Sequence, residues 1–528
     1  LAKTSSVIVS NGNLDAVSTT QSQALLSTIY VSTGKWYAEF TCNSAGTEEA
    51  IGIATSKYMV SEGFYSANKL AVFRSGGNLI SSGFGSALFP TYTTGDVVRI
   101  KLDLDNQKLA IAINGGSFNE ITITNYDSHV AGELWTFHIF CGSSGGSGSF
   151  NSSANFGSRS FAYAAPSGFK SLNTANLPTS TILKGSDYFQ TVLYTGNGSS
   201  QTINGLGFSP DLVWCKTRSA AEHHVLVDVV RGTSKNLFSS TTSAEETTNP
   251  YGSVTALTSD GFTVGGGSID QSRLNANGVT HAAWCWDGGT STVTNTQGSI
   301  TSTVRANASA GFSIVTYTGN GTSNKTVGHG LNVKPGLILV KCRNTSDAWN
   351  VYHSALGANY WLNLNTTGTP YSGYNGGSWN NTEPTSSVFT VNLPSGYSTG
   401  FTNENNINYV AYVFSPVSGY ANAFSYSGSG STDGPFCFLG FRPRLILLKV
   451  SNTTGPWYMF DTARNTYNVM NNRLEANSSS AEASDRSVID VLSNGFKLRD
   501  VDAVWNQSGN TYIGFAWAEN PFSIARAR

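Results

Sequence analysis

The sequence carries one short segment in three copies: Tyr194-Thr-Gly-Asn-Gly-Ser199, Tyr317-Thr-Gly-Asn-Gly-Thr322 and, more weakly, Tyr426-Ser-Gly-Ser-Gly-Ser431. Each copy has an aromatic residue followed by Gly with Asn or Ser, which is typical of a strand that ends in a tight turn. The copies begin 123 and 109 residues apart, a period too long for the blade of a β-propeller. The repeat therefore indicates three related β-domains.

A proline-started apolar run follows each turn, in residues 208–216, 333–341 and 441–449. In every copy the proline precedes a closing lysine by six residues. Proline cannot donate to a β-ladder and is tolerated at the first residue of a strand. An apolar run with this start predicts a strand that is buried on both faces.

An aromatic segment closes each copy, in residues 281–286, 409–414 and 512–517. Its last residue lies 70, 73 and 68 residues after the three lysines, respectively. The shared order and spacing predict three β-sandwich-type repeat domains. Their expected bounds are 185–290, 311–417 and 418–525, with a polar Ser/Thr/Asn link at residues 288–310.

Residues 1–176 lack this repeat and carry a different set of segments: Gly34-Lys-Trp-Tyr-Ala-Glu-Phe40, Ile51-Gly-Ile-Ala54, Gly95-Asp-Val-Val98, Leu102-Asp-Leu-Asp-Asn-Gln-Lys-Leu109, Ile113-Asn-Gly115 and Asn155-Phe-Gly157. In their order and spacing these segments resemble the SPRY domain. The resemblance implies a concanavalin-like β-sandwich whose edge loops bind partners. The residues themselves also alternate as in a half-buried strand, with Trp36, Ala38 and Phe40 on one face. The predicted fold class is all-β: an N-terminal SPRY-like β-sandwich followed by three related β-sandwich-type repeats.

The composition excludes several other classes. Only 12% of the residues are charged and 56 are glycine, which argues against coiled coils and helical solenoids, while 12% aromatic residues supply apolar cores. A net charge of -1 with no basic stripe makes nucleic acid an unexpected partner. No apolar run is long enough for membrane insertion. Six cysteines without a CxxC motif are predicted to be buried free thiols.

Enzyme motifs are missing from the sequence, which has no GxSxG, HExxH or Walker A segment. Asp228 and Asp461 both fall twelve residues after the lysine of their repeat, where the middle copy has His353. Two acids at equivalent places in different domains do not form one catalytic pair. His224 aligns with tryptophans of the other copies, which predicts a packing position. We therefore expect no enzyme, no catalytic residue, no metal and no cofactor.

Aromatic residues in polar loops are the candidate ligand-binding residues. Tyr371, Tyr374 and Trp379 lie in a glycine-spaced loop, and Tyr58, Tyr65 and Arg74 lie where the SPRY family presents its binding loops. Aromatic rings stack on sugars, and neutral polar side chains reach their hydroxyls at low electrostatic cost. For the first loop, packing or contact with a neighbouring subunit is the alternative.

The SPRY-like part, the tandem β-repeats and the joining segment of residues 161–178 together resemble virion proteins of tailed phages, of the fibre or appendage type. The resemblance implies a protein exposed on the particle surface, in contact with other virion proteins and self-associated as a homo-oligomer such as a trimer. Host cell-surface glycan is the implied ligand. We therefore expect a tail-fibre or receptor-binding adhesin that acts by multivalent, non-catalytic contacts. The alternatives are a purely structural capsid or tail decoration protein and a glycan-degrading tailspike.

Overall fold

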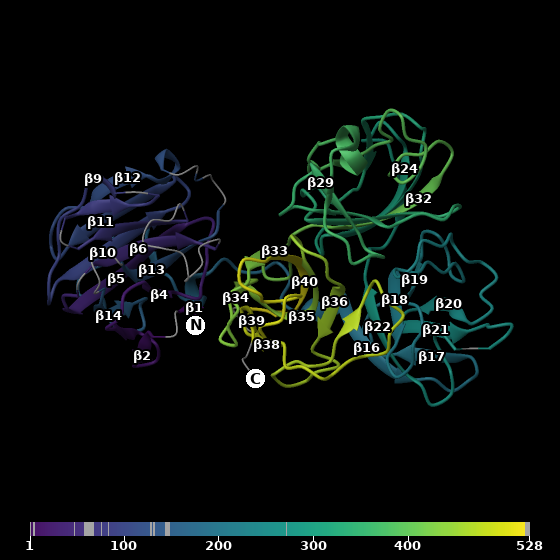
Figure 1. Ribbon diagram of the computed structural model, residues 1–528, viewed down its shortest axis with the longest axis horizontal. Helices are drawn as coiled ribbons and strands as arrows, with labels where there is room; N and C mark the ends of the chain where they lie inside the picture. Colours follow the sequence, from purple (N-terminus) through teal and green to yellow (C-terminus); the bar gives the residue numbers. More distant parts are fainter. Residues whose placement is uncertain are drawn as a thin grey trace. The chain divides into compact units, whose positions relative to one another are not determined.

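The computed structural model describes residues 2–3, 6–46, 48–56, 68–74, 76–82, 84–126, 129, 133–142, 148–270 and 272–522. The chain is all-β, as predicted, and its few helical segments are short 3-10 turns. It divides into two compact units, Leu1–Thr179 and Ser180–Arg528 (Figure 1). The predicted end of the first domain, residue 176, lies close to this division.

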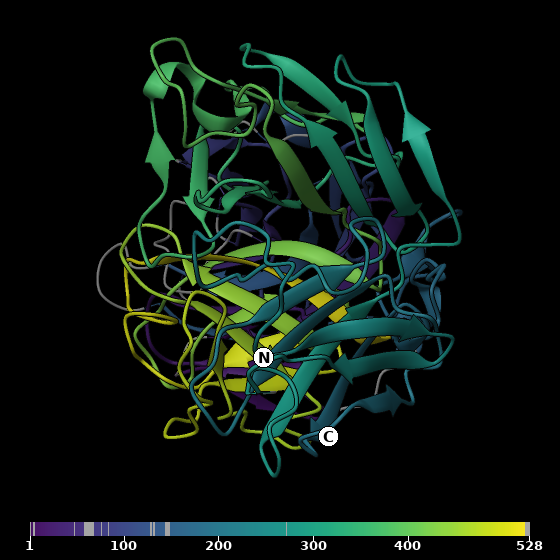
Figure 2. The same ribbon diagram turned by 90° about the vertical axis from the view of Figure 1, so that its right-hand side faces the viewer.

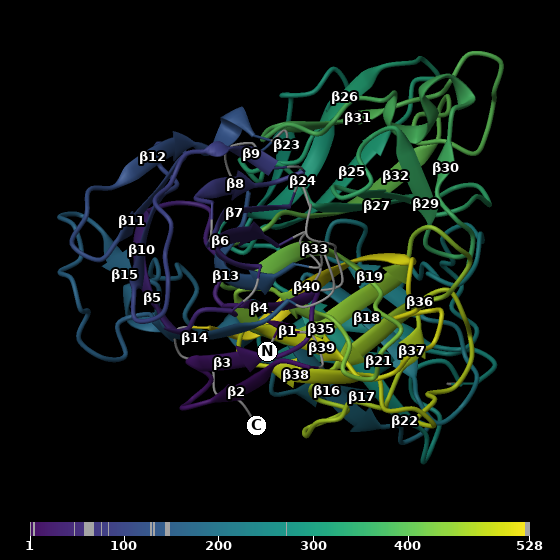
Figure 3. The same ribbon diagram turned by 60° about the vertical axis from the view of Figure 1, so that its left-hand side comes forward.

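The first unit is a sandwich of two antiparallel sheets, seen as two layers in Figure 3. One sheet has the order β1 (Ala2–Lys3), β4 (Gln23–Leu26), β13 (Trp135–Cys141), β6 (Glu49–Thr55), β7 (Lys69–Phe73), β8 (Asn78–Ile80) and β9 (Phe84–Ala87). The other has the order β12 (Asn119–Thr122), β11 (Lys108–Ile113), β10 (Val97–Asp103), β5 (Lys35–Ser44), β14 (Phe150–Asn155), β3 (Asp15–Ser18) and β2 (Ile8–Ser10). The 3-10 turns are η1 (Ile123–Asn125) and η2 (Thr174–Asn176). Trp36, Ala38 and Phe40 of β5 face the core between the sheets, as their alternation predicts.

The joining segment covers the outer face of the second sheet. The backbone N–H groups of Ala162 and Tyr163 donate to the Glu39 carboxylate at 2.7 and 2.8 Å, and the Tyr37 hydroxyl donates to the same group at 2.9 Å. Tyr37 is therefore buried although it points away from the core. Farther on, β15 (Lys170–Ser171) pairs with β5 in parallel. The segment thus belongs structurally to the first unit.

The second unit holds the three repeats, and each is built from a large and a small antiparallel sheet. Repeat 1 combines β16 (Phe189–Thr195), β22 (Thr280–Trp286), β18 (Leu212–Thr217) and β19 (Val225–Asp228) with β17 (Gln201–Asn204), β21 (Gly261–Gly265) and β20 (Ser253–Thr258), after η3 (Gly185–Asp187). Repeat 2 combines β23 (Thr292–Asn295), β24 (Ser302–Asn307), β25 (Phe312–Thr318), β32 (Asn408–Phe414), β27 (Leu337–Cys342), β28 (Asn350–His353), β29 (Tyr360–Asn363) and β30 (Tyr371–Ser372) with β26 (Lys325–Gly328) and β31 (Val388–Val391), and contains η4 (Tyr374–Trp379). Repeat 3 combines β33 (Ala421–Ser427), β40 (Thr511–Pro521), β35 (Phe441–Val450), β36 (Trp457–Asp461) and β37 (Leu474–Glu475) with β34 (Phe436–Phe438), β39 (Gly495–Leu498) and β38 (Ile489–Leu492).

The predicted link at residues 288–310 is not a plain connection. Residues 292–295 and 302–307 form β23 and β24, which extend the large sheet of repeat 2. Ser302 and Val304 are buried and Thr303 between them is exposed, so β24 has one face on the repeat. Because the segment is rich in Ser, Thr and Asn, its composition is that of a loop and does not predict this short strand.

The closing strands are buried on both faces, and so are β18 and β27, the proline-started strands for which the apolar pattern predicts it. In β22, Ala282, Trp284 and Trp286 face a core shared by all three repeats. Ala283 and Cys285 face the separate core of repeat 1. The strand β32 of repeat 2 divides its side chains between the shared core and its own core in the same way. The large sheets of repeats 1 and 2 therefore each serve two hydrophobic cores.

The last aromatic residue of each repeat lies at the centre of the shared core. The ring centroids of Trp286 and Phe414 are 5.9 Å apart, those of Trp286 and Trp517 are 5.4 Å apart, and those of Phe414 and Trp517 are 5.1 Å apart. We call these residues the aromatic trio. Figure 2 shows the three repeats, coloured from blue-teal through green to yellow, grouped around a common centre. We refer to this arrangement as the ring.

A buried asparagine clamps each repeated turn. Asn275, Asn403 and Asn506 all lie eleven residues before the trio residue of their repeat. In repeat 2, the Asn403 amide donates to the Asn320 side chain at 2.9 Å and to the Thr322 carbonyl at 2.6 Å. The first tyrosine of the motif, Tyr317, donates to the carbonyl of Thr402, the residue before the clamp, at 2.7 Å. This clamp explains why the turn segment recurs.

All six cysteines are buried and free, as predicted. Burial raises the pKa of the Cys215 thiol to about 12 and that of Cys141 to about 11, so these thiols stay protonated and unreactive near neutral pH.

Truncation of the aromatic trio tests the shared core. Trp286→Ala removes a side chain that is 1% exposed, and loss of its burial is expected to cost about 3–5 kcal/mol of unfolding free energy. Tyr467→Ala, at a side chain that is 76% exposed, should change stability by less than about 0.5 kcal/mol. Urea unfolding followed by tryptophan fluorescence and circular dichroism measures both. Similar midpoints for the two variants would contradict the shared core.

Candidate functional site

The three repeated lysines are fully buried, and each reaches a neighbouring repeat. Their Nζ atoms donate to backbone carbonyls: Lys216 to Ser479 at 3.3 Å, Lys341 to Thr242 at 3.0 Å and Lys449 to Thr367 at 3.1 Å. The contacts run from repeat 1 to repeat 3, from repeat 2 to repeat 1 and from repeat 3 to repeat 2, so they close a cycle. Burial lowers the pKa of Lys216 and of Lys449 to about 8. The lysines therefore hold the ring together and are not a binding surface.

The position eight residues after each lysine makes a second contact of this kind. At each position a ring nitrogen donates to a backbone carbonyl of another repeat: His224 Nε2 to Glu475 at 3.0 Å, Trp349 Nε1 to Phe238 at 2.8 Å and Trp457 Nε1 to Asn363 at 3.1 Å. His224 Nδ1 accepts from Trp214 Nε1 at 2.9 Å, so Nε2 carries the proton. Burial keeps the pKa of His224 well below its usual value. The predicted packing role of His224 is confirmed.

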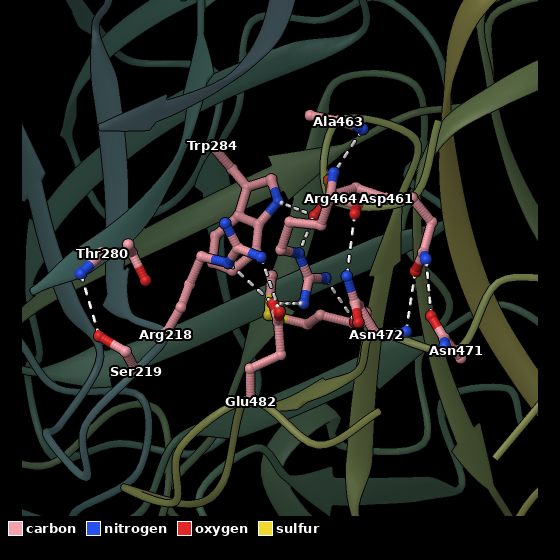
Figure 4. Close-up of polar contacts among 12 residues, drawn as sticks. Arg218, Ser219, Thr280, Trp284, Asp461, Ala463, Arg464, Asn471, Asn472 and Glu482 are labelled. Carbon is pink, nitrogen blue, oxygen red and sulfur yellow. Dashed lines mark hydrogen bonds and ion pairs between the residues drawn. The ribbon is translucent and has the colours of Figure 1, made fainter. Parts of the chain in front are cut away.

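A buried ion network joins repeat 3 to repeat 1 (Figure 4). Asp461 pairs with Arg464 Nε at 2.5 Å and accepts from Trp284 Nε1 of repeat 1 at 3.0 Å. Glu482 contacts Arg464 at 3.1 Å and receives both arms of the Arg218 guanidinium of repeat 1 at 2.9 and 2.8 Å. Burial alone would raise the pKa of Asp461, but the charge and hydrogen bonds of Arg464 outweigh it and hold the pKa below its usual value. The acid is an interface residue.

The same network recurs between repeats 1 and 2. Asp228 pairs with Arg231 Nε at 2.5 Å and accepts from the Tyr412 hydroxyl of repeat 2 at 2.8 Å. Glu245 contacts Arg231 at 2.9 Å and Arg343 of repeat 2 through two bonds of 3.0 Å. Asp228 and Asp461 thus serve two different interfaces, in agreement with the view that they form no catalytic pair.

The third interface, between repeats 2 and 3, departs from this pattern at every position. His353 stands in place of the Asp, and Leu356 and Ser451 stand in place of the two Arg residues. Pro370 replaces the Glu, and Phe515 replaces the facing aromatic donor. Phenylalanine offers no polar hydrogen, and His353 Nε2 instead donates to the Gly514 carbonyl at 2.9 Å. Because Pro370 stands where the other repeats have the clamping glutamate, no ion pair at this position ties the chain that follows to the next repeat.

The loop that follows Pro370 carries the strongest candidate site. Three exposed tyrosines, Tyr371, Tyr374 and Tyr397, are 38%, 47% and 43% exposed and lie over two buried aromatic rings, Trp361 and Phe401. We call these three residues the tyrosine cluster. Ring centroids are 5.5 Å apart for Trp361 and Tyr371, 5.6 Å for Trp361 and Tyr374, 5.7 Å for Tyr374 and Tyr397, and 5.3 Å for Tyr397 and Phe401.

The backbone beneath the cluster is held in an uncommon conformation. Tyr374 and Asn375 both have φ of 50°, a left-handed value that side-chain-bearing residues rarely adopt. Gly377 has φ of 56°, and a Cβ there would lie 2.3 Å from the Trp361 ring. The Asn392 amide donates to the Gly377 carbonyl at 2.7 Å, and Thr402 Oγ1 donates to the Ser378 carbonyl at 2.6 Å. These bonds fix η4 and present the tyrosines on a rigid support.

The structure separates the candidate residues of this loop. Tyr371 and Tyr374 lie at the surface as expected, but Trp379 is only 1% exposed and packs on Tyr352 with centroids 5.9 Å apart. Trp379 is therefore a core residue, which corrects its assignment to the binding loop. The glycine spacing that suggested an open loop instead lets the chain turn inward after Tyr374. Tyr397 was missed because it is distant in sequence and stands in an ordinary Ser/Gly segment.

The candidate residues of the first unit give less information. Tyr58 and Tyr65 lie outside the described residues. Arg74 is half-buried after β7, and its backbone N–H donates to the Glu49 carbonyl at 3.0 Å. Burial raises the pKa of the Glu49 carboxyl to about 7, although the charge of Arg74 opposes the rise.

A search of the described part of the chain finds no set of three or more His, Cys, Asp and Glu side chains placed to hold a metal ion. The same part contains no helix with the length and apolarity needed to span a membrane.

Comparisons with known proteins give one family match. The model of a family described as a domain of unknown function, DUF7483, matches residues 184–521, which include all three repeats. No curated protein matches the chain.

Several solved structures resemble part of the chain. They include the SPRY domain of human HERC1 (17% identity, TM-score 0.23, 28% of this chain and 92% of that chain), stonustoxin (14%, 0.21, 28% and 25%) and the PSpry domain of TRIM65 (8%, 0.21, 28% and 85%). Two of these are SPRY domains, the family that residues 1–176 resemble. Because these TM-scores are low, the description of the first unit as a β-sandwich rests on its own strand pairing.

A pair of matched variants tests the ion network. Arg464→Leu leaves Asp461 buried without its counter-ion and is expected to cost about 3–5 kcal/mol of unfolding free energy. The double variant Asp461→His/Arg464→Leu reproduces the pair that repeat 2 uses naturally, and a neutral histidine can still accept from Trp284. It should be clearly more stable than the single variant in urea unfolding. Equal or greater loss in the double variant would refute the charge-burial explanation.

Proposed function

The chain belongs to the DUF7483 family, whose description assigns no activity, and we propose from its site that it is a phage virion appendage protein, a tail-fibre or receptor-binding adhesin. It contacts host-surface glycan without catalysis. The tyrosine cluster of repeat 2 carries the proposal, because it exposes three aromatic rings to solvent above the buried rings of Trp361 and Phe401. The virion setting comes from the resemblance of the whole chain to tailed-phage fibre and appendage proteins.

The chemistry of the tyrosine cluster suits a neutral sugar. A tyrosine ring offers an apolar face for stacking on a pyranose, and its hydroxyl can donate to or accept from sugar hydroxyls. The neighbouring polar groups are uncharged: Asn375 Nδ2 donates to the Ser395 carbonyl at 3.3 Å, and both residues are exposed. Uncharged groups are cheaper to desolvate than ionised ones, so glycan can replace water here at low cost.

The rigid backbone favours binding by a preformed site. Tyr374 keeps its left-handed conformation because η4 is bonded on one side to Asn392 and on the other to Thr402. A site that is already ordered loses little conformational entropy when the ligand binds. Trp361 beneath the tyrosines limits their movement further.

We propose that each chain makes a weak contact and that binding strength comes from the number of copies. The loops of repeats 1 and 3 that correspond to the tyrosine cluster are occupied by the Glu245 and Glu482 clamps, so among the described residues of the ring the cluster is a feature of repeat 2. Several copies on one particle raise the effective affinity without new contacts. We therefore propose a virion-surface location, self-association and contacts with other virion proteins. The ring already closes its three-fold core within one chain, so self-association uses other surfaces.

Two alternatives remain as competing proposals. In a purely structural virion protein, the same tyrosines would contact neighbouring subunits. A glycan-degrading tailspike would need two accessible carboxyl groups about 5–10 Å apart across a sugar site, whereas the Asp228 and Asp461 side chains are fully buried in ion networks.

Substitution of the tyrosine cluster tests the adhesin proposal. Tyr371→Ala/Tyr374→Ala removes two stacking rings, each worth about 0.5–1.5 kcal/mol, so attachment to host cells should weaken by about tenfold or more. The unfolding midpoint should fall only slightly, because both side chains are at the surface, 38% and 47% exposed. Tyr467→Ala, a variant of an exposed tyrosine in repeat 3, serves as the matched control in the same adsorption assay with fluorescently labelled protein.

Other outcomes point to the alternatives. Unchanged adsorption together with failed particle assembly would overturn the adhesin proposal in favour of a structural protein. Release of reducing ends from host polysaccharide by the purified chain would favour the tailspike.

A further inference from the structure

Two carboxyl groups meet on one backbone N–H in repeat 2. The N–H of Gly400 donates to Asp347 Oδ2 at 2.9 Å and to Glu404 Oε1 at 2.8 Å. The Phe401 N–H also donates to Glu404 Oε1, at 3.3 Å. Glu404 is buried, so water does little to screen the two carboxyls from each other. Two carboxylates this close cannot both ionise without repulsion.

The carboxyl pair is confined to the repeat that carries the tyrosine cluster. Glu404 directly follows the clamping Asn403, and the corresponding residues are Ala276 in repeat 1 and Gln507 in repeat 3. Repeat 1 has Glu222 at the place of Asp347 but Ala276 at the place of Glu404. The pair is therefore not a requirement of the repeat fold.

The Gly400–Glu404 segment connects the pair to the tyrosine cluster by two routes. Tyr397 precedes Gly400 by three residues, and Phe401, which packs on Tyr397 and Trp361, directly follows it. Thr402 Oγ1 donates to the Ser378 carbonyl and so holds η4, which begins at Tyr374. Movement of this one segment would displace two of the three tyrosines.

The surroundings of Glu404 leave its charge only partly compensated. Burial, and then the neighbouring Asp347, raise the pKa of Glu404 to about 7. The other titratable groups around it are Lys341 and Cys342 of β27, Tyr317 of β25 and Tyr409 of β32. The Lys341 ammonium is committed to the Thr242 carbonyl of repeat 1, and the Tyr409 hydroxyl accepts from the Glu404 backbone N–H at 3.0 Å.

We propose that Asp347 and Glu404 share one proton and act as a latch on the tyrosine cluster, closed when the proton is bound and loosened when it is lost. Loss of the proton leaves two negative charges on one donor, which favours separation of the Gly400 segment from Asp347. Ligand binding at the cluster should therefore be tighter in mildly acidic than in mildly alkaline solution. This consequence for binding rests on the proposed function, whereas the latch itself can be tested without a ligand.

The direction of the pH effect follows from linkage. A carboxyl whose pKa is higher in the folded state stabilises that state at low pH, and the stabilisation disappears as the pH rises through the folded-state value. For Glu404 the local stability should fall as the pH rises from about 5.5 through the pKa of about 7 and should level off before about pH 8.5.

Hydrogen–deuterium exchange of the full chain, read on peptides that cover residues 394–404 and corrected for intrinsic rates, tests the latch. Protection in the wild type should fall at least about tenfold from pH 5.5 to pH 8.5, since one pKa unit is a tenfold change in an equilibrium constant. Glu404→Gln, which keeps an acceptor but cannot ionise, should abolish the dependence. Glu222→Gln, at the matching place in repeat 1, should retain it.

Each outcome of the exchange experiment supports or contradicts the latch. Unchanged protection in the wild type, or the same pH dependence in Glu404→Gln, overturns the latch. If Glu404→Gln does not fold, Asp347→Asn removes the shared charge from the other side and must abolish the dependence as well. A latch that titrates in a protein that does not adsorb to cells would refute the proposed function alone.

Discussion

The structure of the ring depends on the double burial of the closing strands. β22 and β32 have no solvent face: one set of side chains fills the core of their own repeat, and the other set fills the core shared by three repeats. A shift of one residue in register would exchange the two sets. Ala283 and Cys285 would then face the shared core in place of Trp284 and Trp286. Three strands must therefore match at once, which explains why the clamping asparagine precedes the final aromatic by eleven residues in every repeat.

Three-fold repetition within one chain relaxes a demand that identical subunits would face. In a symmetric homotrimer every interface is the same, so a loop could not be freed at one interface alone. Here each interface is encoded separately. Two of them keep the Asp–Arg–Glu network, and the third replaces it by His353, Leu356 and Pro370, with one bond from His353 to a backbone carbonyl. The ring stays closed because the lysines and the aromatic trio act at all three interfaces.

The sequence predicts much of the fold and only part of the site. The β-strand content, the double burial of the proline-started strands and the packing role of His224 follow from periodicity and from alignment of the copies. The cross-repeat partners do not, because Asp461 and Trp284 are 177 residues apart and no local pattern joins them. Trp379 was misplaced because a glycine-spaced aromatic loop has the same composition whether its last ring turns outward or inward. Tyr397 enters the site only through tertiary contact.

The tyrosine cluster, the left-handed backbone at Tyr374 and the acid pair all fall on repeat 2, and this coincidence carries the functional argument. A left-handed backbone at Tyr374 and a buried pair of acids each cost stability, so a repeat with a purely structural role would not be expected to collect them. Each becomes intelligible if repeat 2 presents a surface to an outside partner. The missing clamp frees the loop, the strained backbone orients the tyrosines, and the acids act on the segment that holds Tyr397 and η4.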